Sequence, residues 1–359
     1  MSNKRGLVEA FIVATHLIFT IMIEPEMPGI VFGTSGLGNL YKVLSERSKI
    51  EIIGECIKHS PETPFFDTAG KYGAGLALES LGIGLKAAGV NPDEVVISNK
   101  LGWLQTNLST VEPTFEPGVW KDLKHDAIQQ ISYEGILACY HQGNRLLNGY
   151  KAEWVSVHDP DEYLYASNDD TEKRYHDIME AYRALYELKE AGKVKAVGVG
   201  AKDWRVIQKI SSDVRLDWIM IANSMTIHSH PAELVRFMEQ MQEQGVVIIN
   251  SAIFNGGFLT GLDYYNYKPV SPASSPELYH WRESMYAICE KFHVRPEVVC
   301  VAFGQKAPGV KSIALNTTNV HRVQKNIEMI KLSVPQALWA ALVSEGLMDA
   351  SYAQQYLLD

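Results

Sequence analysis

The sequence predicts an α/β chain that folds as a parallel (β/α)8 barrel, a TIM barrel, and two observations lead to this class. Eight short, β-branched and nearly continuous apolar runs recur along the 359 residues, as expected for strands covered on both faces. Helix-length segments alternate with these runs, and a strand followed by a helix eight times over is the pattern of a barrel. The expected strands are 29–35, 63–69, 94–100, 153–159, 194–200, 216–223, 246–252 and 311–316.

The segments between the strands predict helices and two long loops. Residues 102–121 follow the third strand and residues 254–281 follow the seventh. Irregular loops of this length in a compact domain tend to be lids or binding loops. The tail from residue 335 onwards is expected to form one or two amphipathic helices packed on the barrel. The clearest expected helices are 45–59, 76–88, 122–148, 172–191 and 231–244.

A doubly wound open sheet is the main alternative to the barrel. In that fold the first strand is followed by a glycine-rich fingerprint that binds a dinucleotide. Here the first strand is followed by "GTSGLGNL", which lacks the GxGxxG spacing, and no acidic residue stands in the fingerprint context. The barrel is therefore favoured.

The chain is expected to hold one barrel domain, residues 29–359, behind an N-terminal extension, residues 1–28. An apolar run in the extension resembles a signal peptide or a marginal membrane span, but Glu9 and His16 interrupt it. No small-x-small cleavage site follows, and two methionines just before the barrel offer alternative starts. An overlong start or a docked helix therefore remains open beside a signal or anchor.

Charge and cysteine content indicate the kind of partner. The net charge is −9 and the chain has no dense Lys/Arg patch, which disfavours nucleic acid or an anionic membrane as the main partner. A small molecule is expected instead, bound by a monomer or homodimer. The four cysteines show neither CxxC nor zinc spacing and are expected to be buried thiols in a reducing, cytoplasmic compartment. "HSH" at 228–230 has no third ligand at a suitable spacing, so no metal is expected.

Four polar residues mark the carboxyl ends of consecutive strands, where the active site of a barrel lies. Asp67 ends the second strand and Tyr72 follows in its loop, Lys100 ends the third, and His158 ends the fourth. Because neighbouring strands lie about 4.8 Å apart, these side chains are expected to surround a common point. Singly, each has an ordinary alternative: a turn aspartate, a rim tyrosine, a solvated lysine, and a histidine bonded to the carboxylates beside it.

Together the four residues fit one mechanism. A tyrosine has an ordinary pKa of about 10, and a nearby ammonium lowers it by favouring the phenolate. Lys100 is expected to supply that charge, and Asp67 to keep Lys100 protonated through a salt bridge. His158 would orient a carbonyl or hydroxyl oxygen beside Tyr72. Such a site can add a proton to one oxygen, or remove it, while a second chemical change takes place at the carbon attached to that oxygen.

These residues carry a family resemblance. "DTAGKYG", "ISNK" and "VHDPDEY", in this order, resemble the signature of the aldo-keto reductases, and the resemblance covers residues 29–332. It implies a (β/α)8 fold and nicotinamide-dependent interconversion of carbonyl and alcohol, with Tyr72 as proton donor or acceptor. The fragments "GTSGLGNLY" and "AIFNGGFL" are most similar to the sugar-oxidising branch, the D-threo-aldose 1-dehydrogenases.

The resemblance also implies a cofactor site after strands five to eight. Gly200 and Ala201 replace a common Ser-Asn pair, so Asn223 is expected to contact the carboxamide instead. Asn250 stands where many members have a stacking tyrosine, and Phe254 is a candidate substitute. Glycines let a backbone approach a pyrophosphate, and a helix N-terminus suits an anion. The candidate cofactor residues are Gly33, Asn223, Ser251, Phe254, Asn255, Gly256, Asn316, Thr317, Arg322 and Asn326.

One position in this set favours NAD over NADP. NADPH-preferring members carry a lysine at the head of the strand-eight segment, where this chain has Asn316, with Arg322 and Asn326 still in register. Losing a positive charge opposite a phosphate dianion weakens NADP binding. NAD is therefore expected, with use of NADP left open.

NAD preference fits an oxidising enzyme. Tyr72 would then accept the proton of the anomeric hydroxyl of an aldose while C1 is oxidised to the lactone. Trp103, Trp120 and the tyrosines at 264, 265 and 267 could stack on the sugar, or could simply pack on one another. An NADPH-dependent reductase of aldehydes or ketones and a catalytically idle, nucleotide-binding regulatory barrel remain the alternatives.

Overall fold

The computed structural model describes residues 27–166 and 170–358. The expected signal, anchor or docked helix falls within residues 1–26, outside the described part of the chain. None of the described helices is long and apolar enough to cross a membrane.

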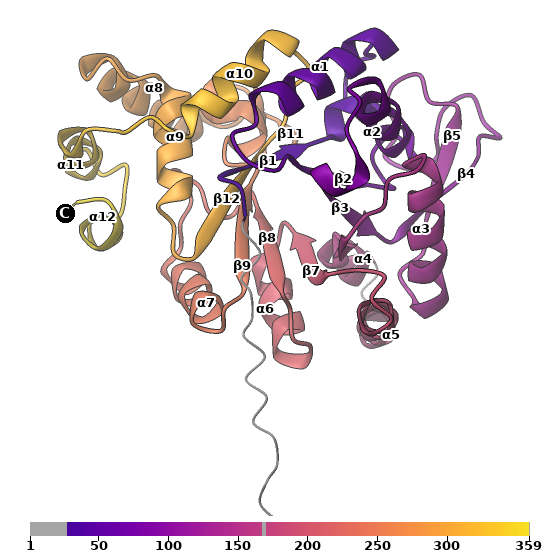
Figure 1. The fold of residues 1–359 in the computed structure, drawn as a ribbon. Coiled ribbons are helices and arrows are strands. Elements are labelled where there is room, and N and C mark those ends of the chain that lie inside the picture. Colours follow the sequence, from indigo (N-terminus) through magenta and orange to yellow (C-terminus); the bar gives the residue numbers. More distant parts are fainter. Residues whose placement is uncertain (1–26, 167–169, 359) are drawn as a thin grey trace, which may run out of the picture.

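Eight parallel strands close into a barrel, as the sequence predicts. Around the barrel the order is β1, β12, β9, β8, β7, β6, β3 and β2, so strands that follow one another in the βα repeat are neighbours. Figure 1 shows the strands at the centre of the molecule with the helices outside them. The strands are β1 (Ile30–Gly33), β2 (Phe65–Ala69), β3 (Val96–Leu101), β6 (Trp154–His158), β7 (Ala196–Ala201), β8 (Trp218–Ala222), β9 (Val247–Ser251) and β12 (Val310–Leu315).

Helices cover the outside of the barrel. Several begin at a side-chain cap; Ser45, for example, accepts the amide of Ser48 where α1 starts. Between the seventh and eighth strands lie two helices, α8 and α9, and α4 precedes α5 after the fourth. The covering helices are α1 (Glu46–His59), α2 (Leu76–Ala87), α3 (Tyr133–Leu146), α4 (Pro160–Tyr165), α5 (Thr171–Glu190), α6 (Trp204–Asp213), α7 (Ala232–Glu243), α8 (Pro276–Lys291), α9 (Pro296–Gln305) and α10 (Val320–Met329).

The tail forms two helices, as expected. These are α11 (Gln336–Ser344), which packs against α8, and α12 (Ala350–Tyr356). Figure 1 shows this pair on the side of the barrel opposite the β4–β5 hairpin.

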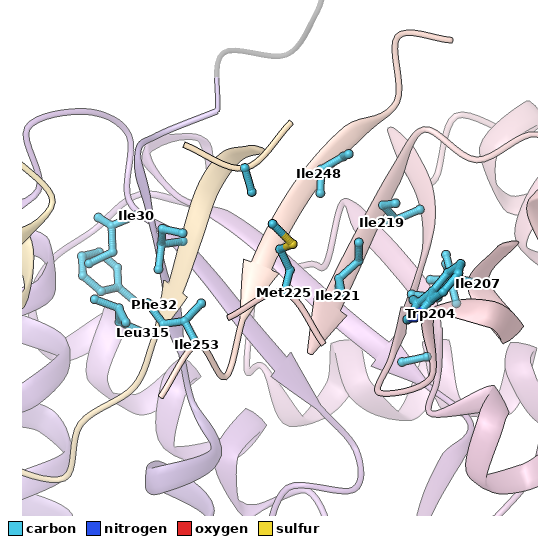
Figure 2. Close-up of a cluster of buried hydrophobic side chains, with 14 of the residues drawn as sticks. Ile30, Phe32, Trp204, Ile207, Ile219, Ile221, Met225, Ile248, Ile253 and Leu315 are labelled. Atoms are coloured by element: carbon cyan, nitrogen blue, oxygen red, sulfur yellow. The ribbon is translucent and has the colours of Figure 1, made fainter. Parts of the chain in front are cut away.

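The described residues form two main hydrophobic clusters and a small third one of Ala74, Phe115, Trp120, Leu123 and Ala127 beside the β4–β5 hairpin. The largest lies between the strands and the helices, and Figure 2 shows a row of its side chains running from Ile30 and Leu315 to Trp204 and Ile207. The second fills the barrel at the amino ends of the strands, where Trp154 and Trp218 pack with ring centres 5.8 Å apart. Gly198 makes room there, because a β-carbon on it would come within 2.4 Å of the Trp218 ring. The barrel interior is therefore a packed core rather than a pore.

Two predicted segments are wrong in part. Residues 122–148 were expected as one helix, but residues 125–129 form β5, which pairs antiparallel with β4 (Trp103–Asn107) inside the expected third loop. Pairing satisfies the backbone groups of both strands, and Ser132 caps the true start of α3 by accepting the amide of Gly135.

The seventh loop is also more ordered than expected. It holds a short 3₁₀ helix (Asn255–Thr260), a small hairpin of β10 (Tyr264–Tyr265) and β11 (Lys268–Pro269), and the first turns of α8. Proline at the start of α8 fits the first turn of a helix, where its missing N–H is not needed.

Candidate active site

Asp67 and Lys100 form a buried ion pair at the carboxyl ends of β2 and β3. The two strands run in register, with Asp67 opposite Ser98 and Ala69 opposite Lys100. Both side chains are about 4% exposed, and the ammonium of Lys100 contacts the Asp67 carboxylate directly. Burial raises the pKa of Asp67 above its ordinary value, while the charge of Lys100 acts in the opposite direction. The expected salt bridge is thus present in the structure.

Tyr72 lies in the turn that follows β2, next to this pair. Its amide bonds to the carbonyl of Ala69 at 3.1 Å, and Gly73 takes a left-handed φ of 62°. A β-carbon on Gly38, in the loop after β1, would come within 2.7 Å of the Tyr72 backbone. Glycine at these two positions therefore lets the two loops touch and fixes where the tyrosine enters the mouth.

The ring of Tyr72 has the other site residues around it. The ammonium nitrogen of Lys100 lies 4.8 Å from the ring centre. The imidazole of His158, the last residue of β6, stands perpendicular to it with ring centres 5.5 Å apart. The structure therefore brings the four sequence-predicted residues to one point of the barrel mouth.

The pKa of Tyr72 differs from the expectation. Burial raises it well above 10, the charges of Asp67 and Asp159 raise it further, and the cation that opposes this rise is Lys71 rather than Lys100. The expected lowering by Lys100 is therefore wrong in this structure, because the desolvation of a buried phenol outweighs the nearby positive charge. At neutral pH Tyr72 holds its proton.

His158 is neutral. Its side chain is buried, and burial lowers its pKa well below the ordinary 6.5. The Nε2 atom lies 3.6 Å from the carboxylate of Asp159, while Nδ1 has no hydrogen-bond partner. Of the acidic residues that follow His158, Asp159 lies beside the ring, whereas Asp161 accepts the amides of residues 202 and 203 and Glu162 pairs with lysines. A neutral imidazole can donate to or accept from a substrate oxygen.

Sequence reasoning missed Lys71, the residue directly before Tyr72. Its side chain is only 4% exposed and contacts three carboxylates, those of Glu116, Asp159 and Glu162. These partners raise the pKa of Lys71, against the opposing effect of burial, so it stays charged. The sequence shows Lys71 in "GKYG", directly before the tyrosine. Its carboxylate partners come from two other parts of the chain, so the sequence alone does not reveal their contacts with Lys71.

Three of the candidate cofactor residues meet where β8 and β9 end. Asn223 takes a left-handed φ of 61°, and its backbone carbonyl accepts from the Asn255 side chain at 3.3 Å. The hydroxyl of Ser251 donates to the carbonyl of Ile221. The Asn223 side-chain oxygen is buried with no hydrogen-bond partner. An unpaired acceptor of this kind fits the amide N–H of a nicotinamide carboxamide.

Asn250 does not take the place of a stacking ring. It is fully buried, and its side-chain amide donates to the carbonyls of Met225 and Gly304, the second of which belongs to α9 outside the barrel. Phe254 lies partly buried against the outer core, and Gly256, with a φ of 73°, packs close to the backbone of Tyr267.

The remaining candidates lie where β12 and β1 end, the next two strands around the barrel. The side-chain amide of Asn316 donates to the Ser35 hydroxyl at 2.8 Å. Gly33, Thr317 and Asn326 line a small cavity between these strands, α1 and α10, and Arg322 is exposed on α10. The ten candidates thus lie at the ends of, or in the loops after, the neighbouring strands β8, β9, β12 and β1, or on α10, and their amides, hydroxyls and guanidinium are groups that can bind a nicotinamide dinucleotide.

The tryptophans expected to meet substrate form a wall beside Tyr72. Phe115 lies between them, with ring centres 5.6 Å from Trp103 and 6.5 Å from Trp120. Trp120 is buried, lies 5.9 Å from the Tyr72 ring and donates its indole N–H to Glu116. In this structure the loop aromatics pack on one another.

The other loop aromatics and histidines are also engaged. Tyr264 stacks on Tyr41 with ring centres 6.0 Å apart, and Tyr265 bonds through its hydroxyl to His228. His230 contacts the carbonyl of Thr226 and accepts the amide of Asp349. Each histidine of "HSH" therefore holds a loop in place.

Comparison with known proteins identifies the family. The model of the Aldo/keto reductase family matches residues 29–344. The chain is similar to a pyridoxal 4-dehydrogenase of Microbacterium luteolum, with 26% identity over 329 residues that cover 88% of this chain and 93% of the relative. It is also similar to a D-threo-aldose 1-dehydrogenase of a Pseudomonas species, with 24% identity over 336 residues, 90% of this chain and 95% of that one.

A solved aldo-keto reductase from Bacillus halodurans, in its holo form, shares the fold. Its TM-score is 0.64 at 18% identity, and the match covers 90% of this chain and 92% of the other. The closed barrel, the arrangement at its mouth and the family match over residues 29–344 agree. The chain belongs to the aldo/keto reductase family.

Proposed function

We propose that this oxidoreductase oxidises C1 of an aldose, in its cyclic hemiacetal form, to the lactone and uses NAD as the hydride acceptor. The observation that carries the proposal is the arrangement around Tyr72: the Lys100 ammonium 4.8 Å from the ring centre, held by Asp67, and the His158 imidazole 5.5 Å from it. A positioned phenol beside a neutral imidazole is suited to exchange one proton with one oxygen.

The proton steps follow from the charges at the site. His158, being neutral, donates a hydrogen bond to the anomeric oxygen and orients it toward Tyr72. The Tyr72 phenolate accepts the hydroxyl proton as the C1 hydrogen leaves with its electron pair. A nicotinamide, when bound, supplies the acceptor for that hydride. In the reverse direction Tyr72 donates the proton to a carbonyl oxygen.

The raised pKa of Tyr72 gives the two directions different pH dependence. Oxidation needs the phenolate, which becomes more abundant as pH rises toward a pKa above 10. Reduction needs the protonated phenol, which is the form present at neutral pH. This observation favours a second candidate function, an NADPH-dependent reductase of aldehydes or ketones. The direction of hydride transfer is therefore the first property to measure.

The substrate class rests on the names of two relatives. One is a dehydrogenase of an aldose at position 1 and the other of pyridoxal at position 4. Aldoses and pyridoxal share one piece of chemistry: an aldehyde that can close on a hydroxyl of the same molecule to give a cyclic hemiacetal. A hemiacetal carries the hydroxyl and the hydrogen on one carbon, which is what the proton step at Tyr72 requires.

Residues at the end of β12 support the preference for NAD. Asn316 is uncharged and is paired with Ser35 rather than facing a phosphate as a cation. Arg322, exposed on α10, is the nearest candidate in the set to contact a 2′-phosphate if NADP is used.

The test is a spectrophotometric screen of the purified full-length protein. Aldoses of both series and pyridoxal would be offered with NAD and with NADP between about pH 7 and 10, the range in which a phenol begins to ionise. NADH formation that rises with pH and disappears in Tyr72→Phe supports the proposal. Turnover only with NADPH and carbonyls supports the reductase, and nucleotide binding without any turnover supports an idle binding barrel.

A further inference from the structure

Glu116 joins the two neighbours of Tyr72 with one carboxylate. It lies in the segment 108–122 between β4 and β5. One of its oxygens lies 2.8 Å from the ammonium of Lys71, the residue directly before Tyr72. The other accepts the indole N–H of Trp120 at 2.7 Å, and the Trp120 ring lies 5.9 Å from the Tyr72 ring.

The backbone at Glu116 is held in an unfavourable conformation to make these contacts. Its φ is 45°, in the left-handed region that residues with a β-carbon rarely adopt. Such conformations persist where the surrounding structure enforces them, and they collect at functional sites. Phe115 on one side of Glu116 is buried against Trp103, while Pro117 on the other side is exposed.

The segment is held at other points as well. Phe115 and Trp120 pack with Ala74, from the turn that carries Tyr72, in a small buried cluster. The far end of the segment is bound to the loop after β1, where the amide of Tyr41 bonds to the carbonyl of Val119 and Asn39 bonds to Lys121. Its tip is free of such ties, and Val111 is 99% exposed. Among the described residues, Glu116 therefore makes the ionic link between this segment and the turn that carries Tyr72.

Because we take Tyr72 to be the proton-transfer group, this inference rests on the proposed function. We propose that Glu116 is a positioning residue that latches segment 108–122 against the Tyr72 turn and so sets the substrate side of the mouth. It acts through Lys71 and Trp120 and touches no reacting atom. The nucleotide-side candidates lie at the ends of β8, β9, β12 and β1, whereas the segment lies between β4 and β5.

The fold should tolerate loss of the latch. Lys71 keeps two other carboxylates, Asp159 at 3.3 Å and Glu162 at 2.9 Å, when Glu116 is neutralised. Removing Glu116 therefore does not leave a buried ammonium unpaired, which is the costly outcome. What is lost is the link from Lys71 through residue 116 to Trp120. A glutamine can accept from Lys71 through its oxygen, but its NH₂ group is a donor and cannot accept the indole N–H of Trp120.

The experiment compares Glu116→Gln with Glu112→Gln in the full-length protein. Glu112 lies in the same segment, is exposed, and has no side-chain contact in the described structure, so its substitution removes the same charge without the latch. Hydrogen exchange of residues 108–124, the melting temperature, the dissociation constant for NAD, kcat and KM are measured for each. The substrate is the best one found with NAD.

The latch predicts a selective effect. In Glu116→Gln, exchange of the segment and the substrate KM rise about tenfold, the size expected for one partly buried charge-assisted contact. The NAD dissociation constant and kcat stay within about twofold of the wild type and the melting temperature within about 2 °C, and Glu112→Gln changes none of these.

Two results overturn the latch: equal exchange and KM in both variants, or a general loss that includes NAD binding and melting temperature. One outcome separates the two proposals: the wild type turns over no substrate, while hydrogen exchange of the segment is faster in Glu116→Gln than in the wild type and Glu112→Gln. In that case the proposed function is wrong, but the role of Glu116 in holding the segment is supported.

Discussion

The ammonium nitrogen of Lys100 lies 4.8 Å from the centre of the Tyr72 ring, and the same ammonium contacts the carboxylate of Asp67. The Asp67 carboxylate comes from β2, the Tyr72 ring from the turn after β2, and the Lys100 ammonium from β3. The three groups lie together because β2 and β3 pair as neighbouring strands. Lys100 is therefore buried between a carboxylate and an aromatic face, two groups that attract an ammonium.

Removing the Tyr72 hydroxyl should abolish turnover without disturbing the fold. Tyr72→Phe keeps the ring and its contacts with Lys100, His158 and Trp120 but has no proton to exchange. We expect kcat to fall by about 10² to 10⁴, the usual contribution of a general acid or base. Steady-state kinetics measure this, while NAD affinity and melting temperature should match the wild type. Retained turnover in Tyr72→Phe would place the proton transfer elsewhere.

Neutralising Asp67 should cost stability as well as activity. Asp67→Asn leaves the Lys100 ammonium buried without its counter-ion, and breaking such a pair costs about 3–5 kcal/mol of unfolding free energy. Glu153→Gln is the matched control, because it breaks the exposed pair with Lys195 and should cost about 1 kcal/mol or less. Urea unfolding monitored by fluorescence distinguishes them. If both variants lose the same unfolding free energy, the Asp67–Lys100 pair contributes no more to stability than an exposed ion pair, and the prediction is wrong.

Nucleotide preference should respond to charge at residue 316. Asn316→Lys is expected to lower the NADP dissociation constant about tenfold and to leave that for NAD unchanged, since only NADP carries a 2′-phosphate. Asn316→Met removes the hydrogen bond to Ser35 without adding charge and should not favour NADP. Titration of the intrinsic fluorescence of the wild type and the two variants with each nucleotide gives the six dissociation constants. The argument for NAD is wrong if the wild type already binds NADP more tightly.

Stability should fall as the solution is acidified below neutrality. Burial lowers the pKa of His158, His228 and His230 below the ordinary 6.5. The unfolded chain therefore takes up these protons at a higher pH than the folded one, and the unfolding free energy decreases as pH falls below about 6.5. The drop between about pH 8 and 5.5 should be smaller in His230→Gln, which removes one of these three imidazoles. Urea unfolding at the two pH values measures it, and an identical drop in both proteins would contradict the prediction.

The barrel and its polar mouth could be predicted because both follow from one-dimensional patterns. Eight apolar runs fix eight covered strands, and the carboxyl ends of parallel strands meet at one rim. His158 is the last residue of β6, Lys100 is next to last in β3, and Asp67 lies two residues before the end of β2. Their meeting therefore needs no knowledge of the loops.

Other features depend on partners that the sequence does not place. β5 lies inside the segment 122–148 that the sequence predicts as a helix, and its pairing with β4 becomes visible only in three dimensions. The pKa of Tyr72 depends on how much solvent the loops remove, and the side chain of Asn250 turns outward to carbonyls of other elements. Lys71 stands beside the tyrosine in sequence, but Glu116, Asp159 and Glu162 reach it from elsewhere.

The rings of Trp154 and Trp218, packed inside the barrel at the amino ends of their strands, leave that end without a passage. A hydride donor or acceptor and its reaction partner must therefore share one entrance if they are to meet at Tyr72. The closed floor of the barrel, which the packing of the core requires, thus leaves the rim as the common way in and out for both.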